Sequence, residues 1–253
     1  MKSILLIVSI GTISLLAQPP MGGRGGGRWG FGGFAGGPPN AAPVTGAPYS
    51  AVEVRTTQQT LANGTVIQHQ QQTTVYRDSM GRTRTEMTMT RPNGQSVTRV
   101  VVRDPVAGVI RNIDPQHQTV HEMAIRPASS ATQSGTATRP RRGPMNRTGN
   151  ASAQTENLGV QTVNGLNATG TRMTRTIAAG AQGNSQAIQT VRETWLSSDL
   201  QVPVMVKTSD PRFGTTTTQL TNIVRAEPDP SLFQDPAGYT VTKGGGRGTG
   251  RQQ

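Results

Sequence analysis

The chain has 253 residues, a net charge of +12 and no cysteine. The absence of cysteine excludes disulfides, thiolate nucleophiles and thiolate zinc sites. Aromatic residues make up only 4% of the chain, so its hydrophobic core is expected to be lean.

The first 17 residues predict a cleaved signal peptide. One Lys precedes an apolar run of 14 residues, Ile4–Ala17, which is shorter than the roughly 20 residues of a membrane-spanning helix. We expect cleavage near Ala17 and a location in the periplasm or outside the cell. No Cys follows the run, so a lipid anchor is not expected. The alternative is a short buried N-terminal segment of a cytosolic protein.

Three segments are rich in Gly, Pro, Ser and Arg: 18–48, 126–155 and 242–253. They contain too few apolar residues to offset the entropy of ordering, so the sequence predicts two flexible tails and one long flexible loop. Eleven cations and no acid lie outside the blocks 49–125 and 156–241, whose net charges are +2 and −1. The basic charge is therefore a property of the low-complexity segments.

The two blocks predict a β-sheet domain at 49–241, interrupted by the loop. Val and Thr are frequent, and turn signals such as Asn63-Gly64 recur about every ten residues, as in an antiparallel meander. We expect an all-β fold, or β with minor helix: a curved antiparallel sheet of about eleven strands, shaped as a half-barrel. The expected strands are 50–61, 65–77, 82–90, 96–104, 109–114, 119–125, 160–163, 166–177, 187–197, 201–209 and 215–227.

Period-two alternation assigns side chains to the two faces of these strands. Val202, Val204 and Val206 share one face, and Pro203 between them predicts an edge strand or a bulge. In 82–90, Met87 and Met89 lie with two threonines opposite a charged face. One apolar face per strand predicts a single wide sheet that curls over a modest core.

The polar residues give no warrant for catalysis. Asp78 and Glu86 lie across a turn with arginines between them, which favours cross-strand ion pairing over acid and base chemistry. His117 and His121 have the i, i+4 spacing of helical metal ligands, but one is expected in a turn and the other on a strand. No nucleophile elbow, phosphate-binding loop or dinucleotide fingerprint occurs. We expect no enzyme activity, no cofactor and no metal.

The stretch GGRGGGRWGFGGF at 22–34 has the composition of RNA-binding tails. Its arginines and aromatic rings would bind phosphates and stack on bases. A signal peptide would carry the chain away from cytosolic RNA, so nucleic-acid binding is not favoured. A flexible cationic spacer, or a contact with an anionic surface, is the preferred interpretation.

A succession of short motifs resembles an uncharacterised family of secreted bacterial β-rich proteins. In broader outline the chain is similar to periplasmic proteins of the outer-membrane lipoprotein carrier and sorting type. The resemblance covers roughly Tyr49–Val241 apart from the loop, and it implies a strongly curved, incomplete barrel whose concave face holds acyl chains under covering helices. The motifs are Tyr76-Arg77-Asp78-Ser79, Gly81-Arg82 with Arg84 and Glu86, Ile113-Asp114-Pro115, Gly165, Gly170-Thr171-Arg172, Trp195-Leu196-Ser197-Ser198-Asp199-Leu200, Leu220-Thr221-Asn222-Ile223, Pro230-Ser231-Leu232-Phe233 and Pro236 with Gly238-Tyr239.

The leading hypothesis is an exported, non-enzymatic protein that binds an apolar ligand, a lipid or lipoprotein, in the cell envelope. The expected sheet-face or ligand-lining residues are Met87, Met89, Trp195, Val202, Val204 and Val206, for each of which plain core packing is the competing interpretation. The rival hypothesis is a structural or surface-interaction protein whose basic tails bind an anionic envelope surface. Ligand identity and oligomeric state do not follow from the sequence.

Overall fold

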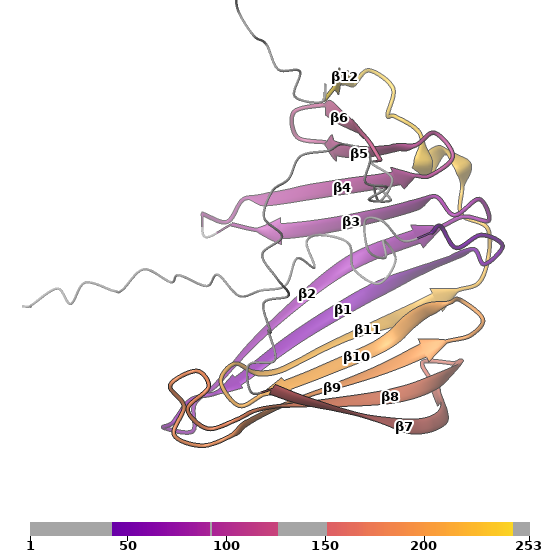
Figure 1. Ribbon diagram of the computed structural model, residues 1–253. Helices are drawn as coiled ribbons and strands as arrows, with labels where there is room; N and C mark the ends of the chain where they lie inside the picture. Colours follow the sequence, from indigo (N-terminus) through magenta and orange to yellow (C-terminus); the bar gives the residue numbers. More distant parts are fainter. Residues whose placement is uncertain (1–41, 92, 126–150, 245–253) are drawn as a thin grey trace, which may run out of the picture. The chain divides into compact units, whose positions relative to one another are not determined.

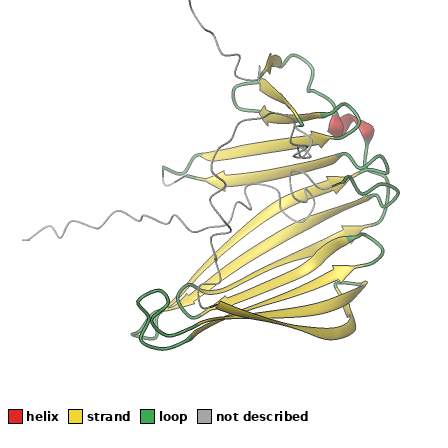
Figure 2. Ribbon diagram, viewed as in Figure 1, coloured by secondary structure: helices red, strands yellow, loops and turns green. Residues whose placement is uncertain are grey.

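The computed structural model describes residues 42–91, 93–125 and 151–244. Among these residues, twelve strands form one sheet, and Figure 2 shows a single short helical turn beside it. The elements are β1 (Tyr49–Thr60), β2 (Val66–Arg77), β3 (Thr83–Thr90), β4 (Ser96–Asp104), β5 (Val109–Asp114), β6 (Thr119–Ala124), β7 (Ala151–Val163), β8 (Leu166–Ile177), β9 (Ile188–Ser197), β10 (Val202–Asp210), β11 (Gly214–Val224), the 3-10 turn η1 (Pro230–Phe233) and β12 (Thr240–Lys243).

The strand order is β12-β6-β5-β4-β3-β2-β1-β11-β10-β9-β8-β7 (Figure 1). The first strand, β1, thus lies in the middle of the sheet, and the following strands run outward to β6. The next strand, β7, lies at the opposite edge. The chain returns to the middle at β11, which pairs with β1. The segment after β11 then crosses to the first edge, where β12 pairs with β6. All neighbouring strands are antiparallel except β12 and β6, which are parallel.

The expected all-β fold with an open, curved sheet is confirmed, since β7 and β12 form its two edges and do not pair with each other. Each of the eleven expected strands is present. Two differences concern the margins: β12 was not expected, and β7 begins at Ala151, inside the segment predicted as a loop. The signal peptide and nearly all of the predicted tails and loop lie outside the described residues. No described helix is long and apolar enough to cross a membrane.

Three register shifts, each explained by an extra residue in one strand, occur on β11, β10 and β7. The shift on β10 lies between Pro203 and Met205. Because proline cannot donate a ladder hydrogen bond, a bulge is where a central strand tolerates it. Strand β10 lies between β9 and β11, so the bulge predicted at Pro203 is confirmed and the alternative of an edge strand is wrong.

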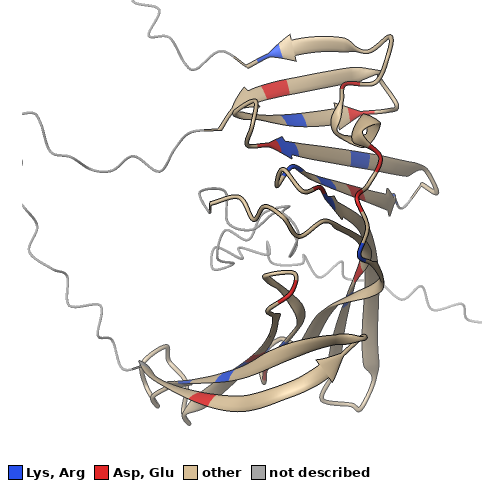
Figure 3. Cartoon of the chain, turned by 90° about the vertical axis from the view of Figure 1, so that its right-hand side faces the viewer, with Lys and Arg blue, Asp and Glu red and all other residues tan. Residues whose placement is uncertain are grey.

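Two separate clusters of buried residues form the core. The first, which we call the main core, includes residues from β1, β2, β7, β8, β9, β10 and β11. The second, the strap core, is built on β4, β5 and β6 and is completed by Phe233 of η1. The segment 225–239 carries η1 across the sheet toward β12, and we call it the strap. In Figure 3, acidic and basic segments lie close together at the end of the sheet that carries β12.

Candidate ligand-binding site

The main core collects buried side chains near one end of seven strands. Most of them are aliphatic, and the aromatic members are Tyr49 and Trp195. Its buried residues are Tyr49, Ala51, Val75, Val163, Leu166, Ala168, Trp195, Leu200, Val202, Val204 and Leu220. The buried apolar residues of this half of the sheet are therefore concentrated at the strand ends near Tyr49.

The Trp195 indole packs closely against the neighbouring strand β8. It is only 7% exposed, and its partner across the β8–β9 ladder is Gly170. A Cβ atom on Gly170 would lie 2.5 Å from Cζ3 of the indole ring. Gly170 does not have a positive φ, so the backbone conformation does not require glycine here. The indole ring requires it instead, because only a residue without a side chain leaves space for the ring.

Tyr49 and Arg77 are directly opposite each other on β1 and β2, and both are almost completely buried. The Arg77 guanidinium carbon lies 4.8 Å from the centroid of the Tyr49 ring. Its Nη2 donates to the carbonyl oxygens of Ala47, at 2.7 Å, and Leu200, at 2.5 Å. Burial lowers the pKa of Arg77, and the nearby Tyr49 partly opposes this effect. A buried cation thus ties the chain before β1 to the β9–β10 turn.

Burial raises the pKa of the Tyr49 phenol to about 12, with Arg77 lowering it and Glu53 raising it by smaller amounts. The phenol is therefore a neutral hydroxyl at physiological pH. No hydrogen-bond partner for Tyr49 Oη or for Trp195 Nε1 is found among the described residues. Most buried polar side-chain atoms have such a partner, and leaving one without costs about 1 to 3 kcal/mol. Two unsatisfied groups in one core cluster are the feature of this site that plain packing does not explain.

The structure brings together part of the predicted ligand-lining set. Trp195, Val202 and Val204 all belong to the main core. Val206 is buried as well but is not a member of either cluster. The ligand-lining role of these residues stays a prediction.

The two predicted methionines lie elsewhere, on β3. Met87 is half-buried and contacts Gln71, and Met89 is exposed. The register pairs Glu86 with Val100, and Val100 belongs to the strap core. Alternation therefore puts the strap core on the charged face of β3 and the methionines on the opposite face. The register pairs Val75 of the main core with Thr85, so the methionines share the sheet face of the main core, and their ligand-lining role stays a prediction.

Sequence reasoning did not single out Tyr49 or Gly170 as site residues, and it noted Arg77 only within the Tyr-Arg-Asp-Ser motif. A signal for Arg77 was present, since it is the last residue of a strand whose alternation puts it on the same face as Val75. The contact between Gly170 and Trp195 has no sequence signal, because it depends on the register of β8 against β9.

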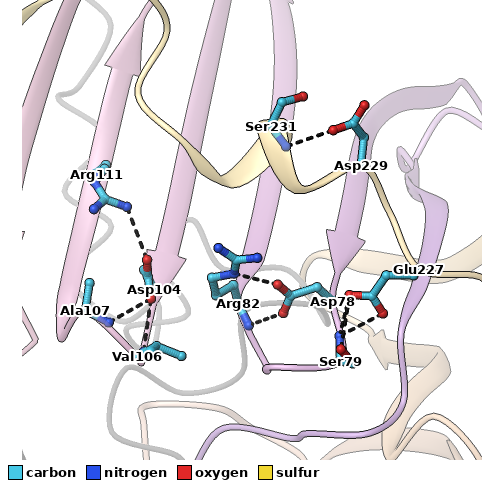
Figure 4. A network of polar contacts seen from close by, with 10 residues as sticks. All are labelled: Asp78, Ser79, Arg82, Asp104, Val106, Ala107, Arg111, Glu227, Asp229 and Ser231. Atoms are coloured by element: carbon cyan, nitrogen blue, oxygen red, sulfur yellow. Dashed lines mark hydrogen bonds and ion pairs between the residues drawn. The ribbon is translucent and has the colours of Figure 1, made fainter.

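A second polar region anchors the strap over β3–β5 (Figure 4). Backbone N and Oγ of Ser79 donate to the Glu227 carboxylate, each at 3.1 Å. Arg84 Nη1 donates to the carbonyl oxygen of Leu232 at 2.8 Å. The Arg82 guanidinium lies 4.9 Å from the centroid of the Phe233 ring. These contacts hold η1 on the strap core, and we assign them a structural role.

The predicted ion pairing of Asp78 and Glu86 is present, although not across strands. Asp78 pairs with Arg82 four residues later, and Glu86 with Arg84 on the same strand, each at 2.5 Å. Asp78 also accepts the backbone N–H of Arg82. Both carboxylates are thus held by arginines. The expectation of no catalytic role for this pair stays a prediction.

The two spaced histidines lie in different surroundings. His117 Nδ1 is 2.7 Å from Asp114 Oδ2 in the β5–β6 turn, and this interaction lowers the pKa of Asp114. His121 lies on β6 beside Thr242 of β12. Within the described ranges no group of three or more His, Asp and Glu side chains is arranged to hold a metal ion.

No family model matches the sequence, and no curated protein matches it either. Solved structures that are similar to the chain include MucB in complex with the periplasmic part of MucA, at 14% identity and a TM-score of 0.30. The match covers 78% of this chain and 57% of the MucB chain, so the chain spans less than two thirds of that protein.

Two further similar structures match most of their own length. Mycobacterium tuberculosis lipoprotein LppX is 16% identical, with 72% of this chain and 90% of that chain covered and a TM-score of 0.31. A LolA superfamily protein from Nitrosomonas europaea is 10% identical, with coverages of 74% and 90% and a TM-score of 0.30. These solved structures are only remotely similar to the chain, and a LolA superfamily protein is among them, which agrees with the distant similarity that the sequence indicated.

Proposed function

We propose that the protein binds an amphiphilic ligand, an acyl chain with a hydrogen-bond-accepting head group, at the main core. The observation that carries the proposal is the pair of unsatisfied groups, Tyr49 Oη and Trp195 Nε1, inside an otherwise apolar cluster. The Trp195 indole N–H is a donor only, and Tyr49 Oη can also donate, so an acceptor is the ligand group that both would bind.

Charge supports an anionic head group. Arg77 is buried beside Tyr49, and its contacts among the described residues are carbonyl oxygens and an aromatic ring rather than a carboxylate. A carboxylate or phosphate close to this cation would gain the electrostatic attraction that a neutral head group lacks. The apolar part of the ligand would lie against the aliphatic side chains of Val202, Val204 and Leu220.

The protein acts, in this proposal, as an exported binding protein of the cell envelope with no enzyme activity. The N-terminal apolar run, Ile4–Ala17, supplies the export signal. Fractionation of cells that express the tagged chain tests the location. Recovery of a form cleaved near Ala17 in the periplasm or medium is expected, and recovery of the uncleaved chain in the cytosol would overturn it.

Displacement of a fluorescent fatty acid, dansyl-undecanoic acid, tests the binding. Trp195→Phe keeps an aromatic ring, although a smaller one, and removes the N–H donor. One charge-assisted hydrogen bond is worth about 1.5 to 3 kcal/mol, so we expect roughly ten- to a hundredfold weaker binding. N-phenylnaphthylamine, which carries no anionic group, should bind both proteins equally.

Tyr76→Phe is the matched control, because Tyr76 packs against the strap core rather than the main core. Binding of the fatty acid should be unchanged in this variant. If the wild-type chain binds no acyl probe, or if Trp195→Phe binds the fatty acid as tightly as the wild type, the proposal fails. The second result would mean that another part of the chain satisfies the indole N–H.

A further inference from the structure

Four large apolar side chains are exposed at the sheet end far from Tyr49. Leu61 and Val66 are at the β1–β2 hairpin and are 38% and 51% exposed. Ile67 follows on β2 at 39%, and Phe213 of the β10–β11 turn is 67% exposed. We call these four residues the tip patch. They are four of the thirteen large apolar side chains that are exposed among the described residues.

The two turns that carry the tip patch are neighbours. Gly214 follows Phe213, and a Cβ atom on Gly214 would clash with the carbonyl oxygen of Gln58. Gly214 has a φ of +85°, so glycine is required here both for the backbone conformation and for the close approach. Figure 1 shows the β1–β2 and β10–β11 turns at the same end of the sheet. Phe213 therefore lies next to the hairpin that carries the other three residues.

The tip patch is separate from the proposed ligand site. Tyr49 begins β1 and Thr60 ends it, and the strand has 12 residues. At about 3.3 Å per residue, the two ends lie roughly 35 to 40 Å apart. No described residue in the half of β2 near the hairpin belongs to either core cluster. The exposure of these side chains is thus not explained by a role in packing.

Charge is distributed unequally between the two ends of the strands. The described residues 54–71, 151–157, 172–193 and 207–218, which lie toward the tip, contain six cations and three acids, a net charge of +3. All other described residues together have a net charge of −1. An exposed apolar patch surrounded by excess positive charge is complementary to a bilayer with anionic head groups, where each nearby Lys or Arg strengthens attachment.

We propose that the tip patch docks the sheet onto the surface of an anionic lipid bilayer, with Phe213 and the β1–β2 hairpin inserted among the head groups. Phe213 carries the Arg212 guanidinium 5.1 Å from its ring centroid. This guanidinium also pairs with Asp210 at 2.7 Å. Its charge is therefore balanced within the chain when the Phe213 ring enters the head-group region. Docking at this end leaves the Tyr49 end of the strands pointing away from the membrane.

Vesicle co-sedimentation with the full chain tests this inference. The probe vesicles contain phosphatidylglycerol and phosphatidylethanolamine, and the variant carries Val66→Ser, Ile67→Ser and Phe213→Ser. We expect roughly tenfold weaker partitioning or more, since even one inserted apolar side chain accounts for a tenfold change. Measuring at about 0.1 M and about 0.5 M salt separates apolar insertion from attraction by basic segments, which salt screens.

The matched control carries Val106→Ser, Val160→Ser and Val224→Ser. The three valines are about as exposed as the tip-patch residues, but they lie elsewhere in the fold. It should bind vesicles like the wild type, as should Trp195→Phe. A second measurement, the fluorescence of Phe213→Trp in a background that carries both Trp29→Phe and Trp195→Phe, should shift to the blue when vesicles are added.

Three results would overturn the inference. They are absence of vesicle binding by the wild type, equal binding by the tip-patch variant, and an unshifted emission of the Phe213→Trp variant in the presence of vesicles. A tip-patch variant that changes from dimer to monomer while binding vesicles normally would assign the patch to contact with a second copy instead. If the wild type binds vesicles but no fatty acid, the proposed ligand site is contradicted and the membrane-docking inference is not.

Discussion

The contact between Gly170 and Trp195 makes the most specific prediction about the main core. In Gly170→Ala, the new Cβ would lie 2.5 Å from Cζ3 and 2.6 Å from Cη2 of the indole. Carbon atoms in ordinary contact are about 3.5 Å apart or more, so the ring must retreat by about 1 Å. Trp195 is buried among the main-core side chains, and overpacking of this kind costs about 1 to 3 kcal/mol.

A second effect has the opposite sign. Alanine in a strand interior is favoured over glycine by roughly 0.5 to 1 kcal/mol, because glycine loses more backbone freedom on folding. The net expectation for Gly170→Ala is therefore a loss of about 1 to 2 kcal/mol in the free energy of unfolding. In a Trp195→Leu background the clash is absent, and the same substitution should stabilise the protein by up to about 1 kcal/mol.

Urea unfolding of the four proteins in this double-mutant cycle measures the coupling between the two sites. Far-UV circular dichroism follows unfolding in all four. In a Trp29→Phe background, the emission of Trp195 reports directly on whether the ring has moved. Equal effects of Gly170→Ala in the two backgrounds would refute the reasoning, as would a stabilised single variant.

The remaining predictions concern pH and the strap. Burial raises the pKa of Tyr49 from 10.0 to about 12, so its neutral form contributes stability that is complete below pH 10 and is lost as the pH rises toward 12. Relative to Tyr49→Phe, the wild type should lose about 3 kcal/mol over that range in urea titrations, and parallel curves would contradict this. The Arg212 guanidinium is the main cause that lowers the pKa of Asp210 from 3.8 to about 2; its stabilisation is present above about pH 4 and lost toward pH 2. Asp210→Asn should therefore remove up to about 2 kcal/mol of acid dependence, and an unchanged acid unfolding curve would argue against the pair. Phe233→Ala should cost about 3 to 5 kcal/mol and weaken hydrogen-exchange protection in β4–β6, whereas full protection would show that the strap does not hold these strands.

Much of the fold could be predicted from the sequence, because the turn residues and the strand patterns that the sequence shows match the strands of the sheet. The six strands before 126 are bounded by Gly, Pro or Asn turns, and the first five of them each pair with the next strand along the chain. In this arrangement, strand order follows sequence order. The pairing of β1 with β11 has no local signal, since it joins residues about 160 positions apart.

The edges of the sheet were harder to predict. The first residues of β7 are mostly exposed on both faces and therefore lack the alternation that identifies a half-buried strand. Strand β12 has four residues and depends on its parallel pairing with β6. In both cases the strand is determined by its neighbour rather than by its own side chains.

The candidate site was predictable only in part. Trp195, Val202 and Val204 were identified because they are apolar residues on regular strands. Tyr49 and Arg77 were missed because a tyrosine and an arginine at strand ends are more often exposed than buried. What marks the site is the lack of hydrogen-bond partners for Tyr49 Oη and Trp195 Nε1 among the described residues, which no sequence pattern shows.

The most direct test of ligand binding at the main core is the NMR signal of the Trp195 indole N–H. In ¹⁵N-labelled protein with Trp29→Phe, this is the only indole signal, since the chain has two tryptophans. Titration with a fatty acid should move it downfield and slow its exchange with solvent as the N–H gains an acceptor. An indole signal that stays unchanged while the fatty acid saturates the protein would contradict binding at the main core.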